Sequence, residues 1–329
     1  MQPAVVAYRG TVVENSHVVH IAVTDSAGSI VRSFNDPSRL TLVRSAAKAA
    51  QAVIAVEAGI MEKFGFTAAE LALMCASHSS EPAQVEAVLA MLAKLGLTED
   101  SLICGGHPAL GDAVNKDWAA TGYIPTAACN TCSGKHVGVL ATAIALGFST
   151  EGYEKPEHPV QQHARKALAE VLGIESGDIT WATDGCGLPT PAFALDKLAN
   201  VYRRIAAGET AAMKVVGEAI SSHPEQVGGV GRFCTELMQA FDGQVIGKFG
   251  ADGTYAIGVR QNGSQPSLGL ALKAEDGNVR VLYAAVCEAL EQLGVGTTQQ
   301  RARLAKWHKL VVTNTLGNQV GHYGFSFEL

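Results

Sequence analysis

The chain begins with short runs of apolar and β-branched residues separated by turn residues. The runs are Ala4–Tyr8, Val18–Val23 and Ile30–Phe34, and the turns fall at Arg9-Gly10 and Ser26-Ala27-Gly28. Apolar runs bounded by glycine-containing turns are typical of strands joined in a meander. We therefore expect β-structure over the first thirty-four residues.

From residue 45 onward the apolar positions recur with a helical period. The first helix is expected over Ser45–Ala58, with Gly59 as its C-terminal cap. Further helices are expected over Ala83–Leu95, Gly134–Leu146, Pro159–Leu172, Pro191–Ala207 and Ala211–Ser222. Short loops rich in Gly, Pro, Asp and Asn separate them. The middle of the chain is therefore predicted to be almost entirely helical.

Strand patterns return near the C-terminal end, followed by a last helix over Asn278–Leu293. The strands are expected over Gln244–Lys248, Thr254–Arg260 and Leu268–Lys273, with hairpin turns at Ala251-Asp252-Gly253 and Gln261-Asn262-Gly263. Strands at both ends with helices between them favour an α+β fold with one mixed, mostly antiparallel sheet. We expect a single domain, residues 1–329, with a sheet lobe (about 1–60 and 240–329) and a mainly helical lobe (about 61–239).

Composition and charge narrow the class of function. Apolar residues make up 47% of the chain and charged residues 17%, which excludes intrinsic disorder. The net charge of -6 argues against a surface for nucleic acid or for an anionic membrane. No secretory signal or long apolar segment is recognised, and seven scattered cysteines do not resemble a disulfide framework. A small-molecule substrate and a cytoplasmic location are expected.

Ser45 and Lys48 form a Ser-x-x-Lys pattern at the start of the first expected helix. Residues three apart share a helix face, so the Lys48 amine can take the proton of the Ser45 hydroxyl if the amine is neutral. A lysine with an ordinary pKa of about 10.4 is protonated at pH 7, so burial or a second cation must lower that pKa. An N-capping serine followed by a solvated lysine gives the same pattern.

A second cluster of hydroxyls follows an apolar, strand-like run, Leu71–Ala76. It reads Ser77-His78-Ser79-Ser80-Glu81 and precedes an expected helix. An N-cap with a capping acid explains Ser79 and Ser80 equally well. Ser77 and His78 are therefore the candidates for a functional role.

Two cysteines and a lysine form a candidate metal site. Cys132 and Lys135 lie three apart at the start of a helix, and Cys186, flanked by glycines, could approach from another loop. Thiolates are soft ligands that suit Zn²⁺. Cys129 and Cys132 also form a Cys-x-x-Cys pair without a second pair, and buried cysteines without a metal are common, so the spacing alone leaves both readings open.

Lys248 is expected on a strand between glycines, in Gly247-Lys248-Phe249-Gly250. A lysine that points into a cleft there could act as a second base or lower the pKa of Lys48. A hairpin with an outward lysine is the plain alternative. The Lys-Thr-Gly strand of penicillin-recognising enzymes matches only in part, because Phe249 occupies the Thr position.

Taken together, the motifs resemble the rhizobial-type, or class 3, L-asparaginases, related to the asparaginase II family. The matching segments run in order through nearly the whole chain: Val13–His17, Arg44–Lys48, Cys75–Glu81, Cys104–Pro108, Cys132–His136, Thr183–Cys186, Gly231–Cys234 and Gly247–Asp252. The resemblance implies a homodimer that hydrolyses L-asparagine to L-aspartate and ammonia. It also implies a fold similar to serine β-lactamases and glutaminases.

The same resemblance assigns roles to residues of this chain. It pairs Ser45 with Lys48 and Ser77 with Lys248 as two catalytic Ser-Lys tandems. It places a zinc ion on Cys132, Lys135 and Cys186. It gives Arg44, His136 and Asp184 roles in holding the substrate or supporting the metal, and it makes Cys234 a reactive cysteine close to the site.

These roles suggest a mechanism in which Ser45 attacks the side-chain amide while a neutral lysine takes its proton. Zinc with three protein ligands keeps a fourth position open, and we expect it to orient the substrate rather than to activate water. Two alternatives are a penicillin-binding or β-lactamase-like serine hydrolase and a non-catalytic, zinc-binding amino-acid sensor. A missing Ser-Asp-Asn motif and Phe249 argue against the first.

Overall fold

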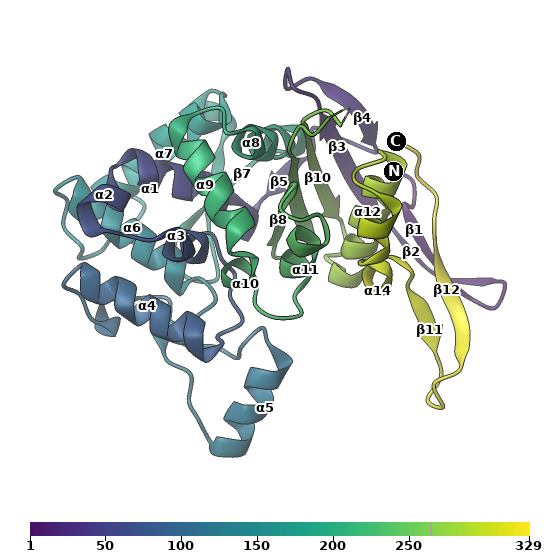
Figure 1. Ribbon diagram of the computed structural model, residues 1–329, viewed down its shortest axis with the longest axis horizontal. Helices are drawn as coiled ribbons and strands as arrows, with labels where there is room; N and C mark the ends of the chain where they lie inside the picture. The colour runs from purple at the N-terminus through teal and green to yellow at the C-terminus, as the bar shows by residue number, and fades with distance from the viewer. Residues whose placement is uncertain (264) are drawn as a thin grey trace. The chain divides into compact units, whose positions relative to one another are not determined.

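Two compact units make up the computed structural model, which describes every residue except Ser264. Unit 1 comprises Met1–Ala46, Phe193–Ala207 and Glu236–Leu329. Unit 2 comprises Ala47–Ala192 and Gly208–Thr235. Most strands belong to unit 1 and most helices to unit 2 (Figure 1).

A five-stranded antiparallel sheet forms the centre of unit 1. Its order is β4 (Ile30–Phe34), β3 (Val19–Thr24), β10 (Leu268–Ala274), β9 (Thr254–Val259) and β8 (Val245–Gly250). Strands from the two ends of the chain therefore share one sheet, as expected. Every residue of β3, β9 and β10 is buried, so both faces of these strands are covered.

Helices α8 (Leu195–Ala207) and α12 (Val279–Gln292) cover this sheet (Figure 1). Helix α8 contacts β10, β9 and β3, and α12 contacts β10 and β9. A Cβ atom added to Gly258 would lie 2.1 Å from the Tyr202 carbonyl oxygen, and one added to Gly269 would lie 2.0 Å from that of Ala199. These two glycines let the α8 backbone approach the sheet.

A second, four-stranded antiparallel sheet in unit 1 corrects the expectation of a single mixed sheet. Its order is β11 (Val311–Thr313), β12 (Gln319–Phe325), β1 (Val5–Arg9) and β2 (Val12–His17). The first two strands thus pair with the end of the chain and not with β3. Five of the six residues of β2 are exposed, because its polar run Glu14-Asn15-Ser16 cannot form a core.

The rest of unit 1 consists of short elements. These are β5 (Leu40–Leu42), α13 (Thr298–Ala302) and α14 (Ala305–His308), and α11 (Phe233–Ala240) lies across the unit boundary. No helix in the described part of the chain has both the length and the apolar content needed to cross a membrane.

Three helices form the centre of unit 2: α1 (Lys48–Glu57), α3 (Ala68–Met74) and α6 (Ser133–Ala145). Helix α1 packs against α6, α7 and α9, and α3 packs against α6 and α9. The other elements of unit 2 are α2 (Ile60–Phe64), α4 (Pro82–Lys94), α5 (Asp112–Thr121), α7 (Pro159–Leu172), β6 (Thr180–Thr183), α9 (Ala211–Ser222), α10 (Pro224–Val227) and the 3₁₀ turns Glu99–Ser101, Ala127–Cys129 and Ser176–Asp178. Strand β7 (Pro189–Ala194) and the 3₁₀ turn Arg44–Ala47 include residues of both units.

Two expected elements are wrong in type. The apolar run Leu71–Ala76 is not a strand: Thr67 and Glu70 form a capping box that starts helix α3, which covers most of the run. Pro191–Ala207 is not helical throughout, because Pro189–Ala194 pairs with β6 as a strand and the helix starts only at Leu195. Helix α8 also belongs to unit 1, since its buried face packs on the sheet.

Candidate functional site

Lys48, the first residue of α1, is the most buried charged side chain of the candidate site. Only 1% of its surface is exposed. Its Nζ donates to the carbonyl of Ala76, lies 3.3 Å from the Ser77 Oγ and lies 3.2 Å from the Cys132 Sγ. A single amine therefore joins a serine hydroxyl to a cysteine sulfur inside unit 2.

Ser77 lies in an irregular buried segment that follows the end of α3. The Ser77 backbone N–H donates to the Val227 carbonyl over 3.1 Å, and that of His78 donates to the Thr131 carbonyl over 3.3 Å. Ser80 has a left-handed backbone with φ of 60°, uncommon for a residue with a side chain, and its Oγ donates to the Cys129 carbonyl. Such strain persists only where the surroundings hold the segment firmly.

Helix α6 presents Cys132 and Lys135 from its first turn. The Cys132 N–H donates to the Asn130 side chain over 2.9 Å, which fixes the N-terminus of the helix. Cys132 and Lys135 are 7% and 5% exposed. The spacing of three residues brings both side chains to one side of the helix, as the sequence predicted.

Asp184 and Cys186 come from the tight turn between β6 and β7. The Asp184 side chain accepts the Gly185 N–H at 2.8 Å, and Gly187 has φ of 88°, which favours glycine. The turn places the Asp184 carboxylate 3.6 Å from the Lys135 Nζ. The Cys186 sulfur is hydrogen-bonded to both Cys132 and Lys135.

Charge in this cluster is shared between the thiols and the lysines. A hydrogen bond from Cys186 and the nearby Lys48 and Lys135 hold the pKa of Cys132 well below its ordinary value, against the effect of burial. That hydrogen bond, together with burial, raises the pKa of Cys186. Burial lowers the pKa of Lys135, but Cys132, Cys186 and Asp184 outweigh it and raise that pKa. These shifts favour a thiolate on Cys132, a thiol on Cys186 and an ammonium on Lys135.

Two buried histidines border the cluster and stay neutral. Burial, aided by Lys135, lowers the pKa of His136 to about 3, and burial, aided by Lys48, lowers that of His78 to about 3. The His136 Nδ1 lies 2.7 Å from the Tyr153 hydroxyl. Its Nε2 is buried and has no hydrogen-bond partner among the residues that the structure describes.

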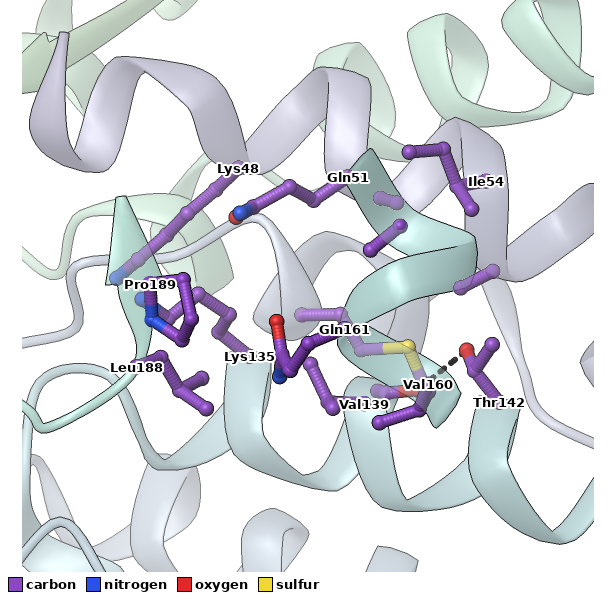
Figure 2. A pocket seen from close by; sticks show the side chains of 15 residues that line it. Lys48, Gln51, Ile54, Lys135, Val139, Thr142, Val160, Gln161, Leu188 and Pro189 are labelled. Atoms are coloured by element: carbon purple, nitrogen blue, oxygen red, sulfur yellow. Dashed lines mark hydrogen bonds between the residues drawn. The ribbon is translucent and has the colours of Figure 1, made fainter. Parts of the chain in front are cut away.

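A partly enclosed pocket of about 40 Å³ lies beside the two lysines. Its lining comes from α1, α6, α7, the end of α3 and the start of β7, and most of its walls are apolar. The side chains of Lys48 and Lys135 converge at the end next to Leu188 and Pro189 (Figure 2). The pocket has room for a few water-sized molecules next to the amines.

The predicted residues Arg44, Ser45 and Lys248 belong to unit 1. Arg44 forms an ion pair with Asp252 and has φ of 50°, a strained conformation directly before Ser45. A Cβ atom on Gly250 would lie 2.4 Å from the Val43 carbonyl oxygen, so the end of β8 lies against the segment that carries Ser45. Lys248 is buried on β8, and its Nζ donates to the Phe249 carbonyl over 2.7 Å.

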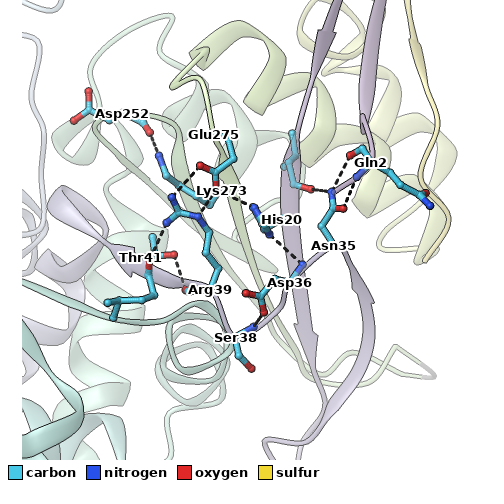
Figure 3. Close-up of polar contacts among 12 residues, drawn as sticks. Gln2, His20, Asn35, Asp36, Ser38, Arg39, Thr41, Asp252, Lys273 and Glu275 are labelled. Carbon is cyan, nitrogen blue, oxygen red and sulfur yellow. Dashed lines mark hydrogen bonds and ion pairs between the residues drawn. The ribbon is translucent and has the colours of Figure 1, made fainter.

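Polar contacts anchor the segment that leads to Arg44 (Figure 3). Arg39 and Glu275 form a two-point ion pair, with the second contact at 3.0 Å. The same carboxylate lies 2.9 Å from the Nε2 of His20, whose Nδ1 accepts the Asp36 N–H. Lys273 donates to the Asp252 carbonyl on the loop that pairs with Arg44. Backbone position near Ser45 therefore depends on polar contacts made by His20 of β3, Lys273 of β10 and the adjacent Glu275.

The predicted residues thus fall into two groups. Unit 2 brings Lys48, Ser77, Cys132, Lys135 and Cys186 together, with Asp184 and His136 beside them. Cys234, also in unit 2, is the second residue of α11 and packs near Gly228, whose carbonyl accepts the Ser79 hydroxyl.

Sequence reasoning missed Tyr153, Asn130 and Asp252 as partners of these residues. No local pattern marks Tyr153, which meets His136 only through the packing of the loop before α7. Asn130 could have been found, because an Asn side chain in a turn commonly accepts the backbone N–H two residues on, as it does here from Cys132.

Comparison with known proteins gives one match over nearly the whole chain. The sequence model of a family described as L-asparaginase II matches residues 5–325. A search of curated proteins finds no match. Because the family match extends from β1 to β12 and includes both groups of candidate residues, it does not rest on a single motif. The chain belongs to the L-asparaginase II family.

Proposed function

We propose that the protein is an amidohydrolase that converts L-asparagine to L-aspartate and ammonia. The observation that carries the proposal is the buried Lys48 amine, which contacts the Ser77 hydroxyl and the Cys132 sulfur in a chain of the L-asparaginase II family. Amide hydrolysis by a serine needs a base beside the hydroxyl, and a neutral lysine amine can serve as that base. The family supplies the substrate class, and the cluster supplies groups with the required chemistry.

In the proposed reaction a serine oxygen attacks the side-chain amide carbon of asparagine. Ser45 is the proposed nucleophile, and Lys48 takes its proton and passes it to the departing ammonia. Water then hydrolyses the resulting ester and returns the proton, releasing aspartate. The contact between Lys48 and Ser77 makes Ser77 either a relay for this proton or the nucleophile itself. We propose that Lys248 supports the site as a second cation.

Two charged groups are proposed to hold the α-substituents of the substrate. Arg44 would bind the α-carboxylate and Asp184 the α-ammonium, each in exchange for its present partner, Asp252 or Lys135. With its α-carboxylate and α-ammonium held by these anchors, glutamine would place its side-chain amide one methylene farther from them than asparagine does. A methylene changes selectivity by about ten- to two-hundredfold. We therefore propose asparagine over glutamine, with His136 and Cys234 lining the same site.

The residues Cys132, Cys186 and Lys135 fit a zinc ion by their chemistry. Both sulfurs and the amine are buried and already joined by hydrogen bonds, and thiolate and amine are donors that suit Zn²⁺. The buried, unpartnered His136 Nε2 marks a further polar atom nearby, in the part of the chain that the structure describes. Bound there, zinc would supply a positive charge that helps to orient the substrate. Lys135 would first have to give up its proton.

Release of ammonia from asparagine and from glutamine, measured in parallel, tests the proposal. Metal content is measured on the same preparation. We expect ammonia from asparagine at a rate at least about tenfold above that from glutamine. Binding of asparagine without ammonia release from a zinc-loaded sample would contradict the proposal and favour an amino-acid sensor. Turnover of a chromogenic β-lactam without turnover of asparagine would favour a penicillin-recognising hydrolase.

We further propose that the protein is a homodimer, as the family resemblance implies, and that it is cytoplasmic, as its scattered cysteines suggest. The exposed edge strand β2, with Val12 67% and Val13 53% exposed, leaves apolar surface that a second copy could cover.

A further inference from the structure

A second pocket of unit 2 lies between α4 and α5 and has no part in the proposed reaction. Its cavity volume of about 550 Å³ is in the range of pockets that hold small molecules. The lining residues are Ser80, Pro82, Val85, Glu86, Ala113, Val114, Asp117, Trp118, Thr121, Tyr123 and Cys129. They include none of the residues assigned above to catalysis, substrate or metal.

The lining residues of α4 and of α5 each belong to a single face of their helix. On α5, Val114, Asp117, Trp118 and Thr121 follow the spacing i, i+3, i+4, i+7 of one helix face. On α4, Pro82, Val85 and Glu86 follow the same rule. Helix α5 has no buried residue, so its apolar face borders a hollow instead of a packed core.

Close contacts fix both ends of the segment 104–125, which carries α5. The Asn130 side chain donates to the carbonyls of Cys104 and Gly105 over 2.9 and 2.8 Å. A Cβ atom on Gly106 would lie 1.9 Å from the Pro125 carbonyl oxygen, so the two ends of the segment touch closely. Tyr123 is also fixed at the pocket wall, because its hydroxyl lies 3.5 Å from the Cys129 Sγ. These contacts position the pocket without filling it.

Aromatic rings and carboxylates define the chemistry of the pocket. The rings of Trp118 and Tyr123 lie 5.3 Å apart between centroids, tilted by 37°. Glu86 and Asp117 supply two carboxylates, and neither forms an ion pair within the described residues. No basic residue of the described chain lines the cavity. A negatively charged hollow with two aromatic faces complements an organic cation.

We propose that this pocket binds a small organic cation of the quaternary or alkylated ammonium class. The cation would lie against the faces of Trp118 and Tyr123, and Glu86 and Asp117 would balance its charge. This class fits better than a metal ion, because aromatic and apolar groups form most of the wall and cannot coordinate one. It also fits better than asparagine, whose carboxylate would meet two negative charges.

Isothermal titration with choline and with 3,3-dimethylbutan-1-ol, a neutral molecule of nearly the same shape, tests the proposal on the intact protein. We expect choline to bind and the neutral molecule to bind at least about tenfold more weakly. Salt should weaken choline binding, because both carboxylates are exposed. Equal binding of the two molecules, or no binding of choline at millimolar concentration, would overturn the proposal. Binding of a trimethyllysine peptide but not of choline would overturn it in favour of a protein partner.

Matched variants locate the site. Trp118→Leu keeps an apolar side chain but removes the aromatic face, and Asp117→Asn removes the charge with little change in shape. Each should weaken choline binding by about two- to thirtyfold. Glu62→Gln on α2, which removes an exposed carboxylate away from the pocket lining, should leave binding unchanged. Circular dichroism confirms folding of each variant. If Trp118→Leu and Asp117→Asn bind choline like the parent, the proposed site is wrong.

Discussion

At the scale of single residues, the candidate site depends on how one buried amine is solvated. Lys48 has lost nearly all contact with water and is compensated by the Ala76 carbonyl, the Ser77 hydroxyl and the Cys132 sulfur. Burying an amine without hydrogen-bond partners is costly, so these three contacts fix the position of the Lys48 side chain. A change at Lys48 should therefore affect chemistry before it affects the fold.

Lys48→Met tests the amine as the base of the proposed reaction. Methionine fills a similar volume, so we expect the protein to fold but asparagine turnover to fall by about 10²- to 10⁴-fold. The measurement is kcat for ammonia release, with thermal unfolding as the check on folding. Lys166→Met, which changes an exposed lysine of α7, should keep full activity. A Lys48→Met enzyme with unchanged kcat would remove Lys48 from the mechanism.

Cys132→Ser tests the proposed zinc site and its supporting role. Serine replaces a soft donor with a hard one, so zinc affinity should fall by more than about tenfold. Because the proposed nucleophile and base are a serine and a lysine, turnover at saturating asparagine should decrease without vanishing. Zinc content is measured by elemental analysis, with Cys104→Ser as the control that keeps its zinc. Complete loss of turnover would show that the metal takes part directly in the chemistry.

At the scale of elements, the packing of α8 on the five-stranded sheet depends on two glycines of the sheet, which have no side chain. Gly258 and Gly269 allow the carbonyls of Tyr202 and Ala199 to approach the strands more closely than any Cβ atom permits. Tyr202 in turn donates its hydroxyl proton to the Ala46 carbonyl, next to Ser45. The close approach of α8 therefore also positions the end of the segment that carries the proposed nucleophile.

Gly258→Ala tests this close approach. The added methyl group would meet the Tyr202 carbonyl, so α8 must shift, and we expect a loss of stability of about 1–3 kcal/mol. Gly177→Ala is the matched control, because its Cβ would meet nothing within 4 Å and its backbone is not left-handed. Chemical unfolding of the two variants gives the comparison. Equal stability of the two would mean that the helix accommodates a side chain at no cost.

At the scale of the whole molecule, each unit has its own group of charged and nucleophilic residues. Unit 1 holds Arg44, Ser45 and Lys248, and unit 2 holds Lys48, Ser77 and the cysteine–lysine cluster. The boundary between the units falls at Ala46 and Ala47, inside the Ser-x-x-Lys pattern. The 3₁₀ turn Arg44–Ala47 that joins Ser45 to Lys48 thus connects the two units covalently.

Light scattering of the purified protein tests the proposed homodimer. One chain has a mass of 34.3 kDa, so a particle of about twice that mass is expected. The physical reason is the pair of exposed valines, Val12 and Val13, on β2, an edge strand that is unpaired on one side in the described chain. Val13→Lys should shift the particle toward the mass of one chain. A single-chain mass for the parent protein at micromolar concentration would contradict the dimer.

Periodic patterns in the sequence predicted the long helices and the buried strands. Helices α7 and α9 lie at the predicted bounds, and β8, β9 and β10 lie within two residues of theirs. Local chemistry decides such elements: the proline that starts α7, the Thr210 cap of α9 and the continuous apolar runs of the strands. The α+β class followed from the order of these elements, and the family match agrees with the residues that suggested the resemblance.

Tertiary structure decided which of these elements pair and which side chains meet. The pairing of β1 with β12 joins the two ends of the chain and is not encoded in either strand alone. Likewise, spacing placed Cys132 and Lys135 on one helix face, but only folding brought Cys186 and the Lys48 amine to them. The second pocket is a further example, because only the folded chain shows that Glu86 and Asp117 lie beside Trp118. The physical reason is that periodicity reports local conformation, whereas contacts between distant residues depend on how the packed elements fit together.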